Sequence, residues 1–228
     1  MAIEIALVGA SGRMGARIDA LASLASDLRI AARVGRASAA SVDARIDVVI
    51  DFSSEAGAAQ ALSIARSHRA ALLVGTTGLS EAMRATLADA SRSIPVLVAP
   101  NTSLGVAVTR RLARIAAEIL GPAGWKVDIV ESHHDRKKDA PSGTAIAIAA
   151  ALAEGGMAVT PDRIHAIRAG DTIGEHEIRL AGPSERIHLM HQAVSRDLFA
   201  EGALRAARWL AGRAPGSYSM DDVLAGQA

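Results

Sequence analysis

The sequence predicts an α/β protein built on a doubly wound parallel sheet, and three observations support this fold class. In the first half of the chain, short apolar runs alternate with stretches of helical periodicity, as in successive βαβ units. Glycines or small polar residues follow most of these runs, where strands are expected to end. Apolar residues make up 50% of the chain and aromatic residues only 2%. The core must therefore be built from Ala, Val, Leu and Ile, which suits helices packed on a parallel sheet.

The expected elements follow one another in a regular order. The first strand leads into a glycine-rich loop and a helix that ends near Ser26. Strands are expected at residues 3–8, 28–34, 47–52, 71–74 and 96–99, with the clearest helices at residues 55–67 and 80–91. The second half shows strand-like runs with few helices between them, at residues 126–131, 163–169, 174–181 and 185–193. This second pattern indicates an α+β domain rather than further βαβ units.

The loop between the first strand and the first helix is the expected cradle for a pyrophosphate. Glycines permit the tight turn and a close approach of the backbone to phosphate, and the helix N-terminus adds partial positive charge. The glycines are Gly9, Gly12 and Gly15, a spacing that departs from the strict G-x-G-x-x-G pattern. The alternative is a plain strand-turn-helix connection. The polar tips of later strands, at residues 51–53, 75–78 and 99–102, fall at the sheet edge where such folds bind ligands.

The choice of dinucleotide is predicted from a missing acid. In the Rossmann-like template, an Asp or Glu about 20 residues after the loop accepts a hydrogen bond from the ribose hydroxyl of the cofactor. Here the stretch reads Ala32-Arg33-Val34-Gly35-Arg36 and contains no acid. An arginine can pair with a 2′-phosphate, so NADPH is favoured over NADH, with Arg36 as a cofactor-binding candidate. The alternative is that Arg33 and Arg36 are ordinary surface residues.

Residues 131–145 carry the strongest chemical signal of the chain. They read Glu-Ser-His-His-Asp-Arg-Lys-Lys-Asp-Ala-Pro-Ser-Gly-Thr-Ala, and the Pro-Ser-Gly-Thr turn opens onto an apolar helical run. Imidazoles and ammonium groups beside free N–H groups of a helix start predict a pocket for a small polyanion. The chain's three lysines are Lys126, Lys137 and Lys138, and a lysine, unlike an arginine, can give up its proton. The alternative is a solvated lysine pair and a chance His-His doublet.

Composition excludes several other classes of function. A formal charge of +1 gives no general field for nucleic acid or membranes, and cysteine is absent, so thiol chemistry is ruled out. With no signal peptide and no apolar run of membrane-spanning length, we expect a cytoplasmic protein. Asp135 and Asp139 lie near the histidines, but the two lysines would repel a cation, so no metal is expected. His188 and His191 fall on opposite faces of a strand and are poor joint ligands.

These motifs resemble one family nearly end to end, the 4-hydroxy-tetrahydrodipicolinate (dihydrodipicolinate) reductases of lysine and diaminopimelate synthesis. Gly-Ala-Ser-Gly-Arg-Met-Gly at residues 9–15 is similar to the family's nucleotide loop, and residues 131–145 match its signature. Further segments that resemble the family are residues 51–53, 75–78, 99–101, 168–170, 174–176, 195–196 and 199–203.

The resemblance implies a fold, an assembly and a set of functional residues. It implies a dinucleotide-binding domain of residues 1–103 and 213–228, and a substrate-binding and oligomerisation domain of residues 104–212 with an open mixed sheet. It implies an NAD(P)H-dependent reduction by a homotetramer. His133 would be the acid/base and Lys137 the proton donor, with the substrate carboxylates bound by His134, Lys137, Ser142, Gly143 and Thr144. The implied cofactor contacts are Gly9, Ala10, Ser11, Gly12, Arg13, Met14, Gly75, Thr76, Thr77, Ala99, Pro100, Asn101 and Thr102.

Two rival functions are left open by the residues alone. One is another nicotinamide enzyme of similar architecture, such as an amino-acid or semialdehyde dehydrogenase, which would have no need of a dicarboxylate cradle. The other is a non-catalytic dinucleotide sensor, which would have no use for Lys137 as a titratable amine.

Overall fold

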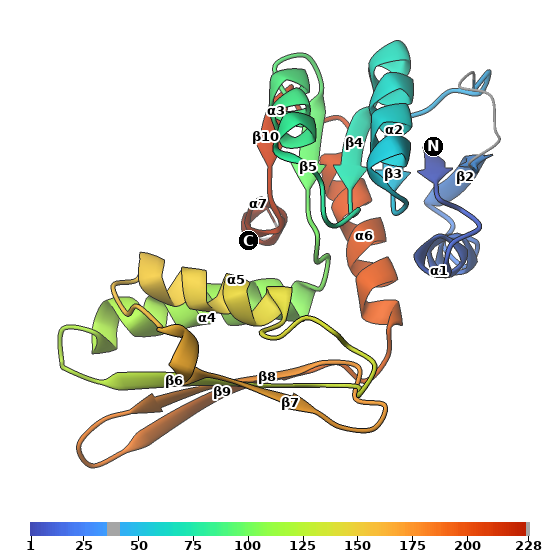
Figure 1. Ribbon diagram of the computed structural model, residues 1–228. Coiled ribbons are helices and arrows are strands. Elements are labelled where there is room, and N and C mark those ends of the chain that lie inside the picture. The colour runs from blue at the N-terminus through green and yellow to red at the C-terminus, as the bar shows by residue number, and fades with distance from the viewer. Residues whose placement is uncertain (36–41, 227–228) are drawn as a thin grey trace. The chain divides into compact units, whose positions relative to one another are not determined.

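The computed structural model describes residues 1–35 and 42–226, and the chain divides into two compact units (Figure 1). Unit 1 comprises Met1–Ser103 and Asp197–Ala228, and unit 2 comprises Leu104–Arg196. The expected boundary at residue 103 coincides with this division, whereas the expected return at residue 213 does not. Helix α6 (Asp197–Leu210) belongs to unit 1, because its small apolar face packs on α1, β3 and β4.

Unit 1 contains a six-stranded sheet in which every pair of neighbouring strands is parallel. The order is β10-β5-β4-β3-β1-β2. The strands are β1 (Ile3–Val8), β2 (Leu28–Val34), β3 (Val48–Asp51), β4 (Ala71–Val74), β5 (Pro95–Val98) and β10 (Gly216–Tyr218). The helices are α1 (Arg13–Ala22), α2 (Glu55–His68), α3 (Glu81–Ala90), α6 and α7 (Met220–Ala225). The predicted doubly wound parallel sheet is confirmed.

Strand alternation explains why both faces of this sheet are apolar. Ala6 and Val8 of β1 belong to one core cluster with α2 and α3, while Ile5 and Leu7, also buried, point to the opposite face. Figure 1 shows α2 and α3 on one side of the sheet and α6 on the other. Because both faces are covered, the central strands are continuous apolar runs rather than alternating ones.

The winding of the chain reverses between β1 and β3. From β1 the chain passes to its neighbour β2 at the edge, then crosses to β3 on the other side of β1. In open α/β sheets ligands bind beyond the carboxyl ends of the strands at such a switch point. The loops that follow β1 and β3 therefore define the place to look for a cofactor.

Unit 2 is an α+β domain with a four-stranded mixed sheet in the order β7-β6-β8-β9. The strands are β6 (Lys126–His133), β7 (Ile164–Arg168), β8 (Glu175–Ala181) and β9 (Arg186–Gln192). The short helix η1 (Pro161–Arg163) directly precedes β7. Strand β7 is parallel to β6, whereas β8 and β9 run antiparallel to their neighbours. Helices α4 (Leu104–Leu120) and α5 (Gly143–Glu154) lie together on one face of the sheet (Figure 1).

The core of unit 2 is a row of aliphatic side chains between the sheet and these helices. It includes Val127 and Ile129 of β6, Ile178 and Leu180 of β8, and Ile148 of α5. Alternation along β6 places Glu131 and His133 on this same face, just beyond the last aliphatic residue. In the described part of the chain, no helix is long and apolar enough to cross a membrane.

Candidate active site

The glycine loop after β1 is shaped by contacts that exclude larger side chains. Gly9 has φ of +81°, in the left-handed region that glycine adopts without strain. A Cβ at Gly9 would overlap the carbonyl oxygen of Phe52, and a Cβ at Gly15 would overlap the carbonyl oxygen of Gly9. The N-cap of α1 is Gly12, which has no side chain to bind the first-turn N–H groups. The loop therefore brings bare backbone to the N-terminus of a helix, the arrangement that accepts phosphate oxygens.

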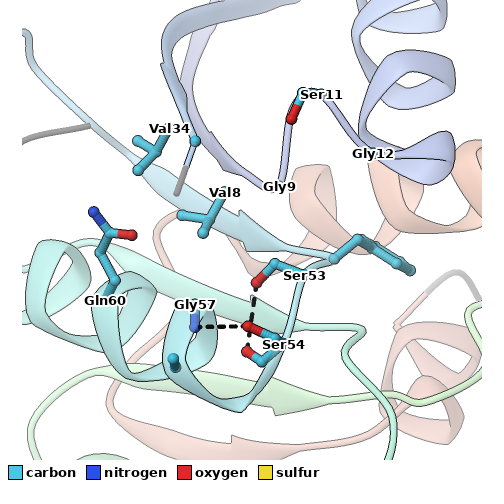
Figure 2. Close-up of a pocket in the computed structure, with 12 residues that line it drawn as sticks. Val8, Gly9, Ser11, Gly12, Val34, Ser53, Ser54, Gly57 and Gln60 are labelled. Carbon is cyan, nitrogen blue, oxygen red and sulfur yellow. Dashed lines mark hydrogen bonds between the residues drawn. The ribbon is translucent and has the colours of Figure 1, made fainter. Parts of the chain in front are cut away.

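A cavity of about 770 Å³ opens at this point, within the size range of small-molecule sites (Figure 2). Its lining comes from the ends of β1, β2 and β3 and from the start of α2: Val8, Gly9, Ser11, Gly12, Val34, Gly35, Phe52, Ser53, Ser54, Ala56, Gly57 and Gln60. Ser54 caps α2 by accepting a hydrogen bond of 3.3 Å from the N–H of Gly57. The cavity thus lies at the switch point between β1 and β3.

A buried carboxylate ties together the loops after β3 and β4. Asp51 is fully buried and accepts hydrogen bonds from the hydroxyls of Ser53 and Thr76, the latter at 2.6 Å. The Ser53 N–H donates in turn to the Thr76 hydroxyl at 2.8 Å. Burial raises the pKa of Asp51, and the two hydroxyl hydrogen bonds oppose that rise. The Phe52 ring lies so close to Gly75 that a Cβ there would overlap it.

The residues expected to bind the cofactor have different surroundings. Among the described residues, Gly9, Ser11 and Gly12 line the cavity, while the expected contacts of the later loops lie outside its lining. The Thr102 hydroxyl is buried and donates to the Phe199 carbonyl at 2.6 Å, so this side chain anchors α6. Arg36 lies outside the described residues, and Arg33 forms two hydrogen bonds with Asp19, at 2.6 and 2.8 Å.

The second site lies at the end of β6 in unit 2. Glu131 is fully buried and accepts two hydrogen bonds from the Arg168 guanidinium, of 3.0 and 2.8 Å. It also accepts the Ser142 N–H at 3.1 Å and lies 2.5 Å from Nδ1 of His133. Strand register brings Arg168 to this cluster, since His133 pairs with Arg168 of β7, and it places His176 of β8 opposite Glu131.

Electrostatics in this cluster favour an ionised Glu131 beside a neutral His133. Burial raises the pKa of Glu131, but hydrogen bonds from Arg168 and His133 outweigh it and leave the pKa below its ordinary value. Burial lowers the pKa of His133; Glu131 opposes this, and the charges of Lys137 and Arg168 add to it. Burial and the neighbouring imidazoles lower the pKa of His176 to about 4.

Lys137 joins the same cluster through two further contacts. Its ammonium lies 2.8 Å from the Asp139 carboxylate, and the Asp139 carbonyl accepts a 2.6 Å hydrogen bond from Arg168. His133 and Lys137 are thus connected through Glu131, Arg168 and Asp139. Ser142 is buried, caps α5 by accepting from Ala145 N–H at 3.1 Å, and lies 3.2 Å from Nε2 of His176.

Three of the predicted substrate residues, Ser142, Gly143 and Thr144, lie at the start of α5. Gly143 and Thr144 form the first turn of this helix, and a Cβ at Gly143 would meet nothing within 4 Å. Nδ1 of His134 is buried and has no hydrogen-bond partner in the protein. The preceding residue, His133, lies on the inner face of the sheet. Within residues 1–35 and 42–226, no group of three or more His, Asp or Glu side chains could hold a metal ion.

Sequence reasoning assigned no role to Glu131, Arg168 or His176. Each stood within a segment that resembles the family, but their convergence depends on strand pairing across 37 and 45 residues. The sequence contained one local signal: Glu131 occupies the same face of β6 as the buried residues Val127 and Ile129. A carboxylate in an apolar row requires a buried partner.

A parallel sheet with a glycine loop at its switch point, joined to a mixed-sheet domain with a buried His–Glu–Arg cluster, is typical of a two-domain oxidoreductase. The chain matches the family models "Dihydrodipicolinate reductase, N-terminus" over residues 3–102 and "Dihydrodipicolinate reductase, C-terminus" over residues 105–224. It therefore belongs to the dihydrodipicolinate reductase family.

Similar proteins agree with this membership. The chain is 46% identical to a 4-hydroxy-tetrahydrodipicolinate reductase of Stenotrophomonas maltophilia, over 97% of this chain and 98% of the relative. It is 38% identical to one of Myxococcus xanthus, over 97% of each chain. The fold is similar to that of the dipicolinate-bound dihydrodipicolinate reductase from Paenisporosarcina sp. TG-14, with a TM-score of 0.80, 20% identity, and coverage of 96% and 98% of the two chains.

Proposed function

We propose that this chain reduces 4-hydroxy-tetrahydrodipicolinate to tetrahydrodipicolinate with a nicotinamide dinucleotide, as a step of lysine and diaminopimelate synthesis. The observation that carries the proposal is His133, buried and bonded to Glu131, close in the chain to Lys137 and to the N-terminus of α5. This arrangement combines two groups that transfer protons with a binding site for carboxylates.

The cofactor fits the cavity in unit 1. Gly9, Ser11 and Gly12 offer backbone and a hydroxyl to a pyrophosphate, and the lack of side chains at Gly9 and Gly15 keeps the loop tight enough for close approach. Ala10, Arg13 and Met14 complete this loop, and residues 75–77 and 99–102 are proposed to contact the nicotinamide half. When bound, the dinucleotide supplies the hydride.

NADPH is the proposed preferred form over NADH. Support comes from the absence of an acid at residues 32–36, around the end of β2, where an NAD-selective site would hold the ribose hydroxyls. Arg33 is bonded to Asp19, so Arg36 is the proposed partner of a 2′-phosphate.

The substrate's two carboxylates are proposed to bind at the start of α5. Backbone N–H groups of Gly143 and Thr144 lie at the positive end of the helix, where anions are stabilised. Lys137 and His134 add cationic or N–H donors. The open space at Gly143 leaves room for a carboxylate to approach the backbone.

The proton transfers balance with two residues. The Lys137 ammonium protonates the C4 hydroxyl, which leaves as water, while Nε2 of His133 takes the acidic proton from C5, beside the imine carbon. This gives a conjugated ring. Once C4 has received the hydride, His133 returns its proton to C5 and the imine is restored. Lys137 recovers its proton from solvent, so one hydride and one proton are consumed and one water is released.

A cytoplasmic homotetramer is the proposed working form, assembled through the sheet face of unit 2 that α4 and α5 do not cover. Ile167 and Met190 lie on strands of this sheet and are 47% and 60% exposed. Light scattering coupled to size exclusion tests the assembly: a tetramer is expected for the native chain, and smaller species for Met190→Lys. A monomeric native chain would contradict the proposal.

The activity is tested by following NADPH and NADH oxidation, with the substrate made in situ by dihydrodipicolinate synthase from pyruvate and aspartate semialdehyde. Oxidation should depend on the synthase, run faster with NADPH, and be lost in Lys137→Ala. Folded protein that shows no synthase-dependent oxidation with either cofactor would overturn the proposal.

Lys137→Arg separates the enzyme from a dinucleotide sensor. The substitution keeps the positive charge but replaces an ammonium, which can give up a proton, with a guanidinium, which cannot. Turnover should fall by about 100-fold or more while dinucleotide affinity stays unchanged. Full activity in this variant would exclude Lys137 as the acid.

A further inference from the structure

Glu131 is the residue to which the groups of the proposed catalytic cluster are bonded. Its two carboxylate oxygens receive the Arg168 fork, the Ser142 N–H and the contact with Nδ1 of His133. These partners come from β6, from β7 and from the residue that caps α5. A fully buried carboxylate with four such contacts is held in one orientation.

The contact with His133 determines where that imidazole carries its proton. An ionised carboxylate only accepts hydrogen bonds, so Nδ1 must be the protonated nitrogen. The neutral ring then has its lone pair on Nε2. Nε2 faces Gly174, and because a Cβ there would stand only 3.0 Å from it, any other residue at this position would crowd that nitrogen.

Resting on the proposed function, we infer that Glu131, oriented by Arg168, is a positioning residue that fixes His133 as the Nδ1–H tautomer and so leaves Nε2 free to take the substrate proton. His133 is therefore the group that reacts, and Glu131 acts only through it. The same carboxylate–imidazole arrangement sets tautomer and ring orientation in other enzyme sites.

Arg168 extends this control to the second proton-transferring group. Its guanidinium bonds both Glu131 and the Asp139 carbonyl, and the Asp139 carboxylate pairs with the Lys137 ammonium. A displacement of Arg168 would therefore move His133 and Lys137 together. Arg168 thus links a buried group at the end of β6 to a group in the loop that follows this strand.

The charged and titratable groups around His133 come from every neighbouring element. Glu131 lies on its own strand, Arg168 on β7 and His176 on β8, with ring centroids of His133 and His176 5.1 Å apart. Lys137 follows in the loop. Among these, Glu131 raises the pKa of His133, whereas Lys137 and Arg168 lower it. Removing the carboxylate's charge should therefore lower the pKa of His133 further.

Glu131→Gln tests the inference, because glutamine keeps the shape but presents an amide that no longer demands an N–H from Nδ1. The expected result is a fall in kcat of about 10²- to 10⁴-fold, with the KM for the dicarboxylate within about threefold. The acidic limb of the kcat/KM profile should move to lower pH, and NADPH affinity should be unchanged. Unaltered kcat and pH profile in folded Glu131→Gln would overturn the inference.

Asp27→Asn is the matched control. Asp27 accepts a comparable two-point contact from Arg208, of 2.6 and 2.9 Å, but this pair lies on the surface of unit 1, outside the His133 cluster. Its substitution should leave kcat and the pH profile as in the native chain. An equal loss in both variants would point to general disruption and overturn the specific role of Glu131.

A measurement on the native chain keeps the test independent of folding and of activity. Nitrogen-15 NMR distinguishes protonated from unprotonated ring nitrogens, and His133→Gln assigns the His133 signals. At neutral pH, Nδ1 should be protonated and Nε2 unprotonated. The opposite tautomer would overturn the inference even if reductase activity were found, and absence of activity with the expected tautomer would fault the proposed function alone.

Discussion

Replacing Arg168 with methionine should destabilise the protein far more than removing a similar arginine from the surface. Methionine fills much of the volume of the arginine stem but cannot pair with Glu131, which is fully buried. Removing one partner of a buried ion pair leaves an uncompensated charge and costs about 3–5 kcal/mol. Because the Arg168 side chain is 19% exposed, the lower end of about 3 kcal/mol is expected.

Urea unfolding followed by circular dichroism measures this effect. At a slope of about 3 kcal/mol per molar urea, the midpoint should fall by about 1 M at neutral pH. Arg208→Met is the control, since Arg208 makes two comparable bonds with Asp27, of 2.6 and 2.9 Å, on the surface. Its midpoint should change little, because exposed pairs contribute little to stability.

The pH dependence of the stability difference between the native chain and Arg168→Met tests this explanation. In the native chain the pKa of Glu131 lies below its ordinary value, so its pairing stabilises the fold above that ordinary value and is lost as pH falls through the folded pKa. Without Arg168, burial favours the protonated carboxyl. The difference in unfolding free energy between native chain and Arg168→Met should thus shrink from pH 7 towards pH 4. A difference that is constant with pH, or no larger than that of Arg208→Met, would refute the reasoning.

Three further predictions concern unit 1. Gly15→Ala should weaken NADPH binding, since its Cβ would overlap the Gly9 carbonyl, although alanine favours the helix by about 1 kcal/mol. Unchanged NADPH affinity in a fluorescence titration would contradict this. Asp51→Asn should flatten the pH dependence of stability. Because the folded pKa of Asp51 is raised, this residue contributes stability below the ordinary carboxyl pKa, and that contribution is lost as pH rises through the folded pKa. Thermal melts at pH 4 to 7 that match those of the native chain would contradict this prediction. Gly202→Ala should lower the melting temperature by several degrees, since its Cβ would overlap the Thr102 carbonyl on which α6 packs; an unchanged melt would show that α6 shifts freely.

The parallel sheet could be predicted because its signals are local. Most of the strands β1 to β5 are apolar runs with a glycine or a small or polar residue at or just after their end, and the predicted strand at residues 71–74 agrees with β4 at both ends. Helix α4 was missed although its apolar residues recur at helical spacing, and β10 is only three residues long, too short to form a pattern. The resemblance to the family implied a return of the chain at residue 213, and nothing in the sequence of α6 indicates against which sheet this helix packs.

The candidate site was predicted in part for the same reason. His133, Lys137 and Ser142 stand close together in one segment, so composition alone drew attention to them. Arg168 and His176 reach the site only through the register of β7 and β8 against β6, which is a long-range property of the folded sheet. Glu131 is recognisable as important only once its burial is known, because an exposed glutamate at the same position would need no partner.

Transfer of label from the cofactor tests the central proposal most directly. NADPH carrying two deuterium atoms at C4 of the nicotinamide is supplied with substrate generated by the synthase, and the product is examined by mass spectrometry. The account predicts tetrahydrodipicolinate one mass unit heavier with the native chain, and no labelled product with Lys137→Ala. Cofactor oxidation without label in the product, or labelled product formed equally well by the variant, would contradict it.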